Sequence, residues 1–186
     1  MDVIKRAREL QRADFDAILV EQAQAVVEEV MRLKELADAF ARFARLPEQK
    51  PEPLDPKDLV DHALALYASG NGVVVERDYE RAPATIEVDR TQMLTVVTNL
   101  VKNAVEAMDA TAADKRVVKA TVEADGNDVV IGVDDAGPGI SADIRDRLFT
   151  PYVTTKGSRG TGLGLALSHR IVMEHGGSIE AGVSDK

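Results

Sequence analysis

The stretch VVKATVEADGNDVVIGVDDAGPGI, residues 117–140, decides the fold of this chain. Its two runs, 117–124 and 128–135, alternate in polarity and are rich in β-favouring residues, so each predicts a strand. Asp125-Gly126-Asn127 joins the runs and is a strong signal for a β-hairpin. The second run leads directly into a glycine-rich turn. A sheet with two carboxylates at the end of one strand is therefore expected.

Further helix and strand patterns surround this hairpin, in the order helix, strands, helix, hairpin, loop, helix, strand. Asp55-Pro56 makes a good helix start because it combines a capping carboxylate with a proline in the first turn. The order predicts an α+β fold, an α/β sandwich whose mixed sheet is covered on one face by helices. The expected helices begin at Asp55-Pro56 and cover 89–108 and 163–175, and the other expected strands cover 73–80, 84–88 and 178–183.

A separate helical segment is expected before this domain. Residues 13–46 contain no proline or glycine, and their apolar residues recur at spacings near three and four, as in a bundle or coiled coil. A single amphipathic helix folded onto its own domain is the alternative. The stretch LPEQKPEPLDP holds four prolines among charged residues, which predicts a linker. The expected division is a helical segment over 1–46, a linker over 47–56 and a second domain over 57–186.

The composition limits the classes of function. The 186 residues are 45% hydrophobic and 30% charged, the balance of a soluble globular protein. A formal net charge of −9 disfavours generic nucleic-acid binding. The chain has no cysteine, which excludes disulfides and thiolate metal sites. No apolar run approaches the roughly 18 residues of a membrane span, so a cytoplasmic location is expected, with a membrane-anchored parent protein left open.

The helix expected over 89–108 carries a polar edge. Asn99, Asn103 and Glu106 gather there because residues three and four apart share a helix face. Amide and carboxylate oxygens suit a hard ion such as Mg²⁺, which also keeps waters and substrate phosphates as ligands. The alternative is that these side chains only meet water.

The turn after the hairpin, 134–140, is a second candidate. Gly137 and Gly139 allow the backbone to approach a ligand closely, and the carboxylate of Asp135 can accept a hydrogen bond from an amine such as that of adenine. An ordinary turn is the alternative, since this composition is also good turn chemistry.

A third candidate is GTGLGL, residues 160–165, which opens the last helix. Free N–H groups and the positive end of a helix favour phosphates there. The stretch is neither a P-loop nor a convincing dinucleotide fingerprint. The preceding loop carries Lys156 and Arg159 and could close over a nucleotide as a lid, unless both side chains are merely solvated.

Taken in order, TNLVKNAVEAM, DDAGPGI, LFTPYVTT and GTGLGLAL resemble the N, G1, F and G2 boxes of the ATP-binding domain of histidine kinases. The resemblance covers roughly residues 55–183 and implies the Bergerat sandwich, with ATP or ADP and Mg²⁺ as ligands. It implies that Asn103 coordinates Mg²⁺, that Asp135 recognises adenine, and that Asn103, Glu106 and Lys102 act in catalysis. The nucleotide-binding residues that it implies are Asn99, Asn103, Asp135, Gly137, Gly139, Ile140, Thr155, Lys156, Gly160, Thr161, Gly162, Leu163, Gly164 and Leu165.

Asn99 stands where gyrase-type ATPases carry a water-activating glutamate, so hydrolysis is disfavoured and transfer to a histidine is expected. An ATPase of the gyrase type and a nucleotide-binding regulatory or dimerisation module without an acceptor are the alternatives. Glu106 could polarise the accepting imidazole or lie in the outer shell of the ion.

The helical segment resembles the second helix of the dimerisation and phosphoacceptor hairpin of nitrogen-regulation sensor kinases. That resemblance implies a homodimer through residues 13–46, a response regulator as partner, and an acceptor histidine outside this chain. His62, His169 and His175 are expected to be structural or surface residues. Residues 1–12 could be the end of the first helix, and the family's sheet has a further strand after 178–183, so both ends are expected to be truncated.

Overall fold

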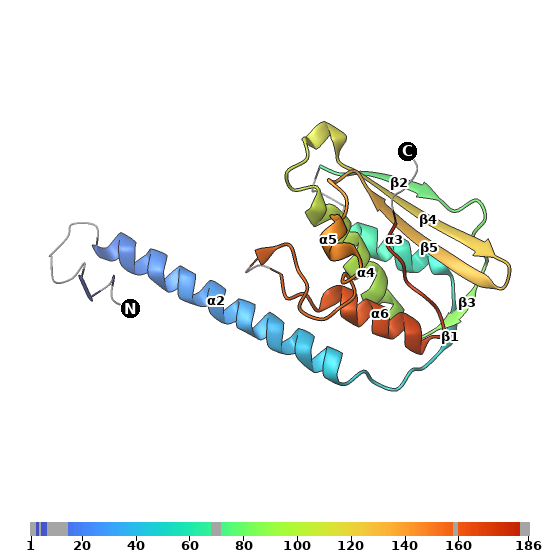
Figure 1. Cartoon of the computed structure of the whole chain (residues 1–186), viewed down its shortest axis with the longest axis horizontal. Coiled ribbons are helices and arrows are strands. Elements are labelled where there is room, and N and C mark those ends of the chain that lie inside the picture. The colour runs from blue at the N-terminus through green and yellow to red at the C-terminus, as the bar shows by residue number, and fades with distance from the viewer. Residues whose placement is uncertain (1–2, 4, 7–14, 68–71, 158–159, 183–186) are drawn as a thin grey trace.

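The computed structural model describes residues 3, 5–6, 15–67, 72–157 and 160–182 (Figure 1). Two small sheets form. Strands β2 (Val74–Asp78), β4 (Val117–Asp125) and β5 (Asp128–Asp135) lie in the order β2-β4-β5, with β2 parallel and β5 antiparallel to β4. Strands β1 (Glu52–Leu54) and β3 (Ile86–Val88) form an antiparallel pair. The larger sheet is mixed, as predicted.

The expected hairpin is confirmed. Asp125 pairs with Asp128, so Gly126 and Asn127 form a two-residue loop between β4 and β5. Gly126 has φ +60°, a conformation that glycine adopts without the steric penalty that a Cβ brings.

Two helices contact the larger sheet, α3 (Pro56–Tyr67) and α4 (Arg90–Ala107), and α6 (Gly164–Glu174) packs on α4. Helix α4 contacts both α3 and α6 (Figure 1). The main core lies where α3, α4 and β4 meet, and its fully buried members include Leu59, Val101 and Val118. This part of the chain also has two short helical pieces, the 3₁₀ turn η1 (Ala113–Lys115) and α5 (Ala142–Arg145).

Helix α4 begins where the sequence predicts. The carboxylate of Asp89 accepts a hydrogen bond of 2.9 Å from the N–H of Gln92, which caps the helix. The same carboxylate accepts from the N–H of Lys50 at 2.9 Å. These two bonds lower the pKa of Asp89, with the bond from Gln92 as the larger cause. His175 accepts from the N–H of Asp89 at 3.2 Å, so the end of α6 is joined to the start of α4.

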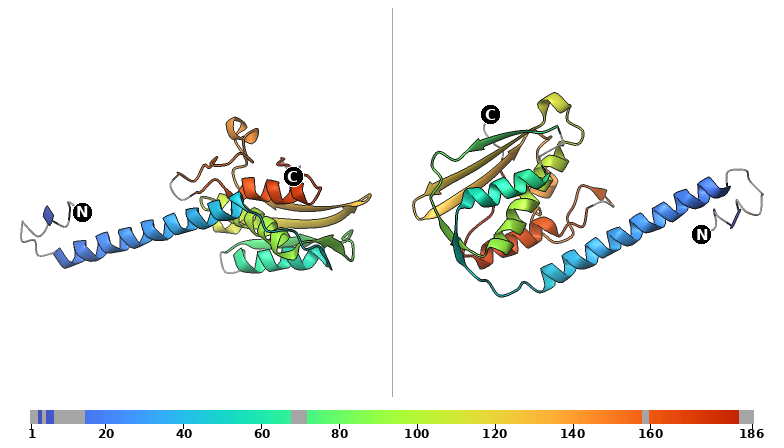
Figure 2. Two further views of the ribbon diagram at one scale, coloured as in Figure 1. Left: turned by 90° about the horizontal axis from the view of Figure 1, so that it is seen from below. Right: turned by 180° about the vertical axis from the view of Figure 1, so that it is seen from behind.

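Helix α2 (Phe15–Ala44) extends away from this body (Figures 1 and 2). Near its end, Phe43 and Leu46 pack on a small apolar cluster formed by Val96, Leu167 and Ile171. Arg170 donates to the carbonyl of Phe43, and the amide of Gln92 donates to the carbonyl of Pro47 at 3.0 Å. The expected end of a first helix over 1–12 lies largely outside the described residues.

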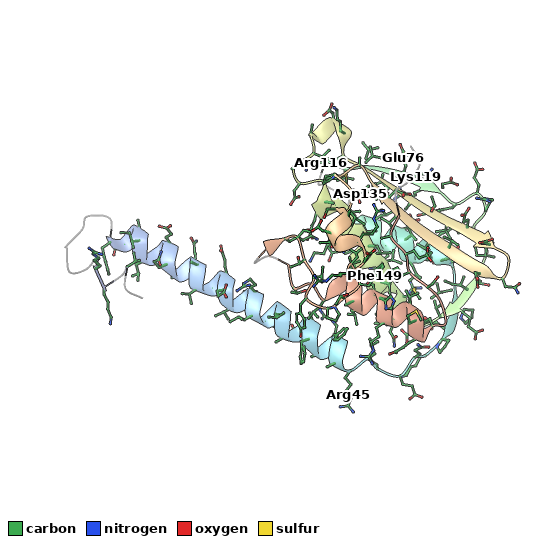
Figure 3. The ribbon with its side chains drawn as sticks, viewed as in Figure 1. Arg45, Glu76, Arg116, Lys119, Asp135 and Phe149 are labelled. Carbon is green, nitrogen blue, oxygen red and sulfur yellow. The ribbon has the colours of Figure 1, made fainter. Side chains whose placement is uncertain are left out.

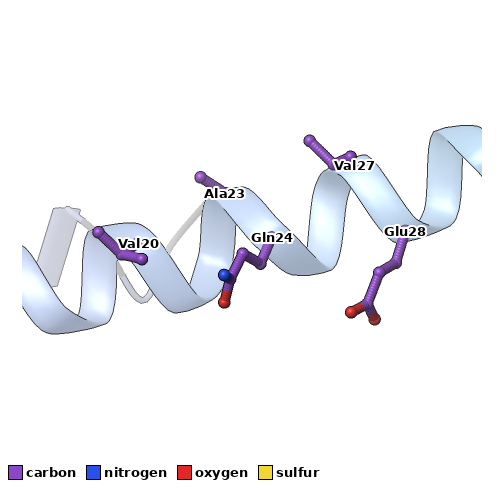
Figure 4. Close-up of a pocket in the computed structure, with 5 residues that line it drawn as sticks. All are labelled: Val20, Ala23, Gln24, Val27 and Glu28. Carbon is purple, nitrogen blue, oxygen red and sulfur yellow. The ribbon is translucent and has the colours of Figure 1, made fainter.

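A hollow lies along α2, lined by Val20, Ala23, Gln24, Val27 and Glu28 (Figure 4). All five residues come from one helix, so the described part of the chain supplies only one wall of the hollow and we assign no ligand to it. Among the described helices, none combines the length and the apolar character needed to cross a bilayer.

Two expectations differ from the structure. Strand β1 lies inside the stretch predicted to be a linker; Leu54 points into the core, and Pro53 is tolerated because the strand lies at a sheet edge. Residues 178–182 form no strand, although 178–183 was predicted to be one; Val183 lies outside the described residues. Alternation alone does not make a strand, because a strand needs a ladder with a neighbour, and 178–182 are in none of the described ladders.

Candidate functional site

The polar edge of α4 meets the loop before α6. The ammonium of Lys156 donates to Asn103 Oδ1 at 2.7 Å and forms an ion pair with the carboxylate of Glu106. Lys102 Nζ lies 3.8 Å from the other oxygen of Glu106. Three residues of α4 and Lys156, which follows them by about fifty positions, therefore gather into one cluster.

Asn99 lies one turn earlier on α4 but faces another neighbour. Its amide nitrogen lies 3.2 Å from the carbonyl oxygen of Gly164 and 3.2 Å from the hydroxyl of Ser168. The side chain of Ser168 is fully buried. Asn99 therefore ties α4 to the first turns of α6 and is separate from the Lys156 cluster.

Asp135 ends β5 and is exposed (Figure 3). Its Oδ1 accepts a hydrogen bond of 2.8 Å from the N–H of Gly137, which fixes the carboxylate beside the turn. A Cβ on Gly137 would lie only 3.2 Å from the Cβ and the carbonyl oxygen of Ala107, near the end of α4. Gly139 has φ +78°, and Ile140 is half-buried. The backbone of this turn is thus pressed against the end of α4.

The glycine loop is held at its base by the preceding segment. The N–H of Tyr152 donates to the carbonyl of Gly162 at 2.9 Å. Gly162 has φ +64°, and a Cβ there would lie 2.7 Å from Tyr152 Cα, so a larger residue does not fit. Thr161 Oγ1 accepts from the N–H of Leu163 at 3.3 Å.

Helix α6 then starts without a side-chain hydrogen bond from its N-cap residue, Leu163. Unpaired N–H groups at a helix start favour anions. Leu163 is buried, Leu165 is half-buried, and Gly160 and Gly164 flank the turn. Thr155 is exposed in the loop, and Arg159 lies outside the described residues.

Three features were missed by the sequence reasoning. Ser168 partners Asn99, and its signal is a hydroxyl on the apolar side of a helix. Thr154 Oγ1 accepts from the N–H of Lys156 at 3.1 Å. Tyr152 has φ +67°, a conformation uncommon for a bulky residue, and the sequence carries no signal for it.

The three histidines have the structural or surface settings expected of them. His62 is exposed on α3. The ring of His169 lies 5.5 Å from that of Phe149. His175 Nδ1 lies 2.8 Å from the carbonyl oxygen of Ile171, and its other nitrogen accepts from Asp89.

Asn103 and Glu106 fit a divalent ion that takes its other ligands from water and a bound phosphate. Within the described part of the chain, no three His, Cys, Asp or Glu residues are grouped so that they could cage a metal. The Lys156 ammonium already bridges Asn103 Oδ1 and Glu106, so these two acceptors do hold a cation between them. One amide and one carboxylate suit Mg²⁺, which takes its remaining ligands from water and phosphate.

Comparisons with known proteins point to one family. Residues 88–186 match the family described as histidine kinase-, DNA gyrase B- and HSP90-like ATPase. Nitrogen regulation protein NtrY of Azorhizobium caulinodans is 36% identical over 159 residues, which cover 83% of this chain and 20% of that protein. Sensor histidine kinase ZraS of Escherichia coli K12 is 33% identical over 161 residues, which cover 85% of this chain and 34% of ZraS. The chain thus spans a fifth to a third of the length of these two relatives.

Solved structures agree. Full-length ShkA in complex with AMPPNP has a TM-score of 0.69 and 28% identity, covering 84% of this chain and 34% of that one. The nucleotide-free catalytic domain of histidine kinase ThkA has a TM-score of 0.59 and 27% identity, covering 67% of this chain and 81% of that domain. These neighbours confirm the expected α+β fold, in which a helical segment precedes a domain with a mixed sheet and helices.

Proposed function

Because this chain belongs to the family of histidine kinase-, DNA gyrase B- and HSP90-like ATPases, we propose that it binds an adenine nucleotide with Mg²⁺. We further propose that it donates the γ-phosphoryl group to a histidine outside this chain. Residues 57–186 would form the catalytic domain, residues 1–46 a dimerisation-type segment and residues 47–56 the connection between them.

The order of three contacts along α4 carries this proposal. Asn99 touches the start of α6 at Gly164, and Ala107 lies against Gly137 of the turn after β5. Asn103 lies midway between them. Eight residues of helix rise about 12 Å, so the loop proposed for the phosphates and the turn proposed for the base meet the second half of α4 about 12 Å apart, with the proposed cation ligand between them. An adenine nucleotide has the same order of groups: base, metal-bound phosphates, terminal phosphate.

At the base end, Asp135 would accept a hydrogen bond from the adenine amine with its second oxygen, since its Oδ1 already accepts from Gly137. A Cβ at Gly139 would meet nothing within 4 Å, which would leave space for the ring, and Gly137 lets the turn lie against Ala107. At the phosphate end, N–H groups of residues 160–165 would hold the phosphates, and Thr155 and Lys156 would lie over them. When bound, the magnesium ion would neutralise phosphate charge, with Asn103 as its protein ligand.

The catalytic contribution of the chain would be positioning and charge neutralisation. Glu106 and Lys102 lie next to Asn103 and could act on the incoming imidazole and the phosphates. Asn99 is engaged with Gly164 and Ser168, and no carboxylate occupies its position to activate water. This favours transfer to histidine over hydrolysis of the gyrase type.

Calorimetry with ADP tests the proposal through Asp135→Asn. We expect Mg²⁺-dependent ADP binding by the native chain and at least about a tenfold weaker affinity in the variant, because a lost hydrogen bond to a charged group costs roughly 1.5–3 kcal/mol. Asp134→Asn, the neighbouring carboxylate on β5, is the matched control. Binding that is indifferent to Asp135→Asn would refute the assignment.

Transfer is tested separately, by adding a histidine-bearing dimerisation helix from a related kinase and following the phosphoryl group of labelled ATP. The second candidate, an acceptor-less regulatory or dimerisation module, is favoured by the exposed apolar residues of α2. It predicts ADP binding without transfer in this assay. A response regulator would be the partner under the kinase proposal only.

A further inference from the structure

The contact of Lys156 with α4 occupies the ligands proposed for the metal. Its ammonium lies 2.7 Å from Asn103 Oδ1 and is paired with the Glu106 carboxylate. About a third of the Lys156 and Glu106 side chains is exposed, 32% and 35%. The pair is thus partly shielded from water, which strengthens it relative to a fully exposed pair.

This lysine comes from a loop whose base is fixed. The hydrogen bond from Tyr152 to Gly162 closes the base of the loop, and the N–H of Lys156 donates to Thr154 Oγ1. In Figure 1 the segment between α5 and α6 extends beyond α4 and α6, on the side where α2 lies. The Lys156 side chain reaches back from this loop to the middle of α4 and joins the two.

We propose that Lys156 acts as an internal cation, which docks the loop segment 150–157 on α4 while the site is empty and must leave when Mg²⁺–nucleotide binds. The family resemblance implied only that Lys156 binds the nucleotide. Docking on Asn103 and Glu106 gives the same side chain a second position. The proposal of displacement rests on the proposed function; the docking itself does not.

Charge and distance make the two cations mutually exclusive. Mg²⁺ binds oxygen at about 2.1 Å. An ion on Asn103 Oδ1 would therefore lie within about 5 Å of an ammonium that is itself 2.7 Å from that oxygen. Lys102 already places a second positive charge 3.8 Å from Glu106. Two ammonium groups and a divalent ion around one carboxylate repel one another strongly in a partly shielded site, and Lys156, on a loop, is the group that can move.

The docking is tested by hydrogen–deuterium exchange of segment 150–157 in the nucleotide-free protein. Lys156→Met keeps most of the stem and removes the charge, and Glu106→Gln removes the partner. Each is expected to speed exchange about three- to fivefold, the range of a partly exposed ion pair. The double variant is expected to exchange no faster than either single one, because both remove the same contact.

Lys102→Met is the matched control, since Lys102 approaches the same carboxylate without touching the loop. In this variant, hydrogen–deuterium exchange of segment 150–157 is expected to stay unchanged or to slow. Unchanged exchange in Lys156→Met, or an equal effect of Lys102→Met, would overturn the docking. Melting temperatures equal to the native value would show that each variant is folded.

The displacement is tested by repeating the exchange with saturating Mg²⁺–ADP and with Mg²⁺ alone. We expect Mg²⁺–ADP to abolish the difference between native protein and Lys156→Met, and Mg²⁺ alone to preserve it. If Mg²⁺–ADP binds and the difference persists, the displacement is wrong. If ADP does not bind, the proposed function and the displacement both fail, while the docking result still stands.

Discussion

Asn99 and Asn103 are the same residue type one turn apart on α4, yet they have different surroundings. Asn103 shares its oxygen with the Lys156 ammonium, whereas Asn99 holds Gly164 and the buried hydroxyl of Ser168. Helical spacing predicts that both lie on one edge, but it cannot tell which residue of α6 each will meet. That choice depends on how α4 and α6 pack.

Replacing Asn99 should therefore cost stability. Asn99→Ala leaves the buried hydroxyl of Ser168 and the carbonyl of Gly164 without this donor, and an unsatisfied buried polar group costs about 1–3 kcal/mol. Urea unfolding should show that loss. Thr155→Ala, at an exposed loop position, should stay within about 0.5 kcal/mol of the native protein. A loss below that limit in Asn99→Ala would mean that the contact with α6 is dispensable.

At the scale of elements, the sequence predicted the helices and the hairpin well. The ranges 89–108 and 163–175 correspond to α4 (Arg90–Ala107) and α6 (Gly164–Glu174), because capping and glycine signals mark their ends. Strand β1 was missed because it lies in a stretch, 46–56, that holds four prolines, and only its pairing with β3 makes it a strand. Residues 178–182 were overpredicted because alternation says nothing about whether a partner strand is present.

The docked position of Lys156 was also beyond sequence reasoning. The loop composition indicates a basic lid, and the glycines indicate a turn at its end. The contact with Asn103 joins residues 53 positions apart, and no local pattern encodes such a pairing.

The cap of α4 predicts a pH dependence of stability. The pKa of Asp89 is lowered by hydrogen bonds from Gln92 and Lys50 to its carboxylate. A lowered pKa contributes stability above the unfolded value of about 3.9, and this contribution is lost as the pH falls through the folded value. Asp89→Ala should therefore lower the free energy of unfolding by about 1 kcal/mol at pH 7, and the difference should shrink below about pH 4.

Asp89→Asn provides the matched comparison, because asparagine caps a helix about as well as aspartate but does not titrate. It should keep most of the stability at pH 7 and lose less of it on acidification. Chemical unfolding at pH 7, 5 and 3.5 would measure both effects. Parallel pH profiles for the native protein and both variants would contradict this role of the carboxylate.

At the scale of the whole molecule, α2 presents apolar side chains to solvent. Leu19, Val26, Leu33 and Phe40 recur at seven-residue intervals and are 41%, 62%, 53% and 53% exposed. A seven-residue apolar repeat is the pattern of a coiled-coil seam. The proposed homodimer through residues 13–46 would cover it.

The dimer can be tested by placing charge in this seam. Val26→Lys together with Leu33→Lys should raise the dimer dissociation constant at least about a hundredfold, since unpaired charges in a helix seam are costly. Light scattering over a concentration series would measure it. Val130→Lys, at an exposed valine of β5, should leave the mass unchanged. A native chain that is monomeric at every concentration would exclude the dimer.

The contacts along α4 also require a fixed number of residues between Asn99 and Ala107. One residue inserted between Asn99 and Ala107 would turn everything beyond it by about 100°, so Gly164 and Gly137 could no longer both meet their positions on the helix. The loop at Gly126 and Asn127 does not set the spacing of these contacts, and a residue added there lengthens only the tip of the hairpin. This protein should therefore accept changes of length at the far end of its hairpin and reject them in the middle of α4.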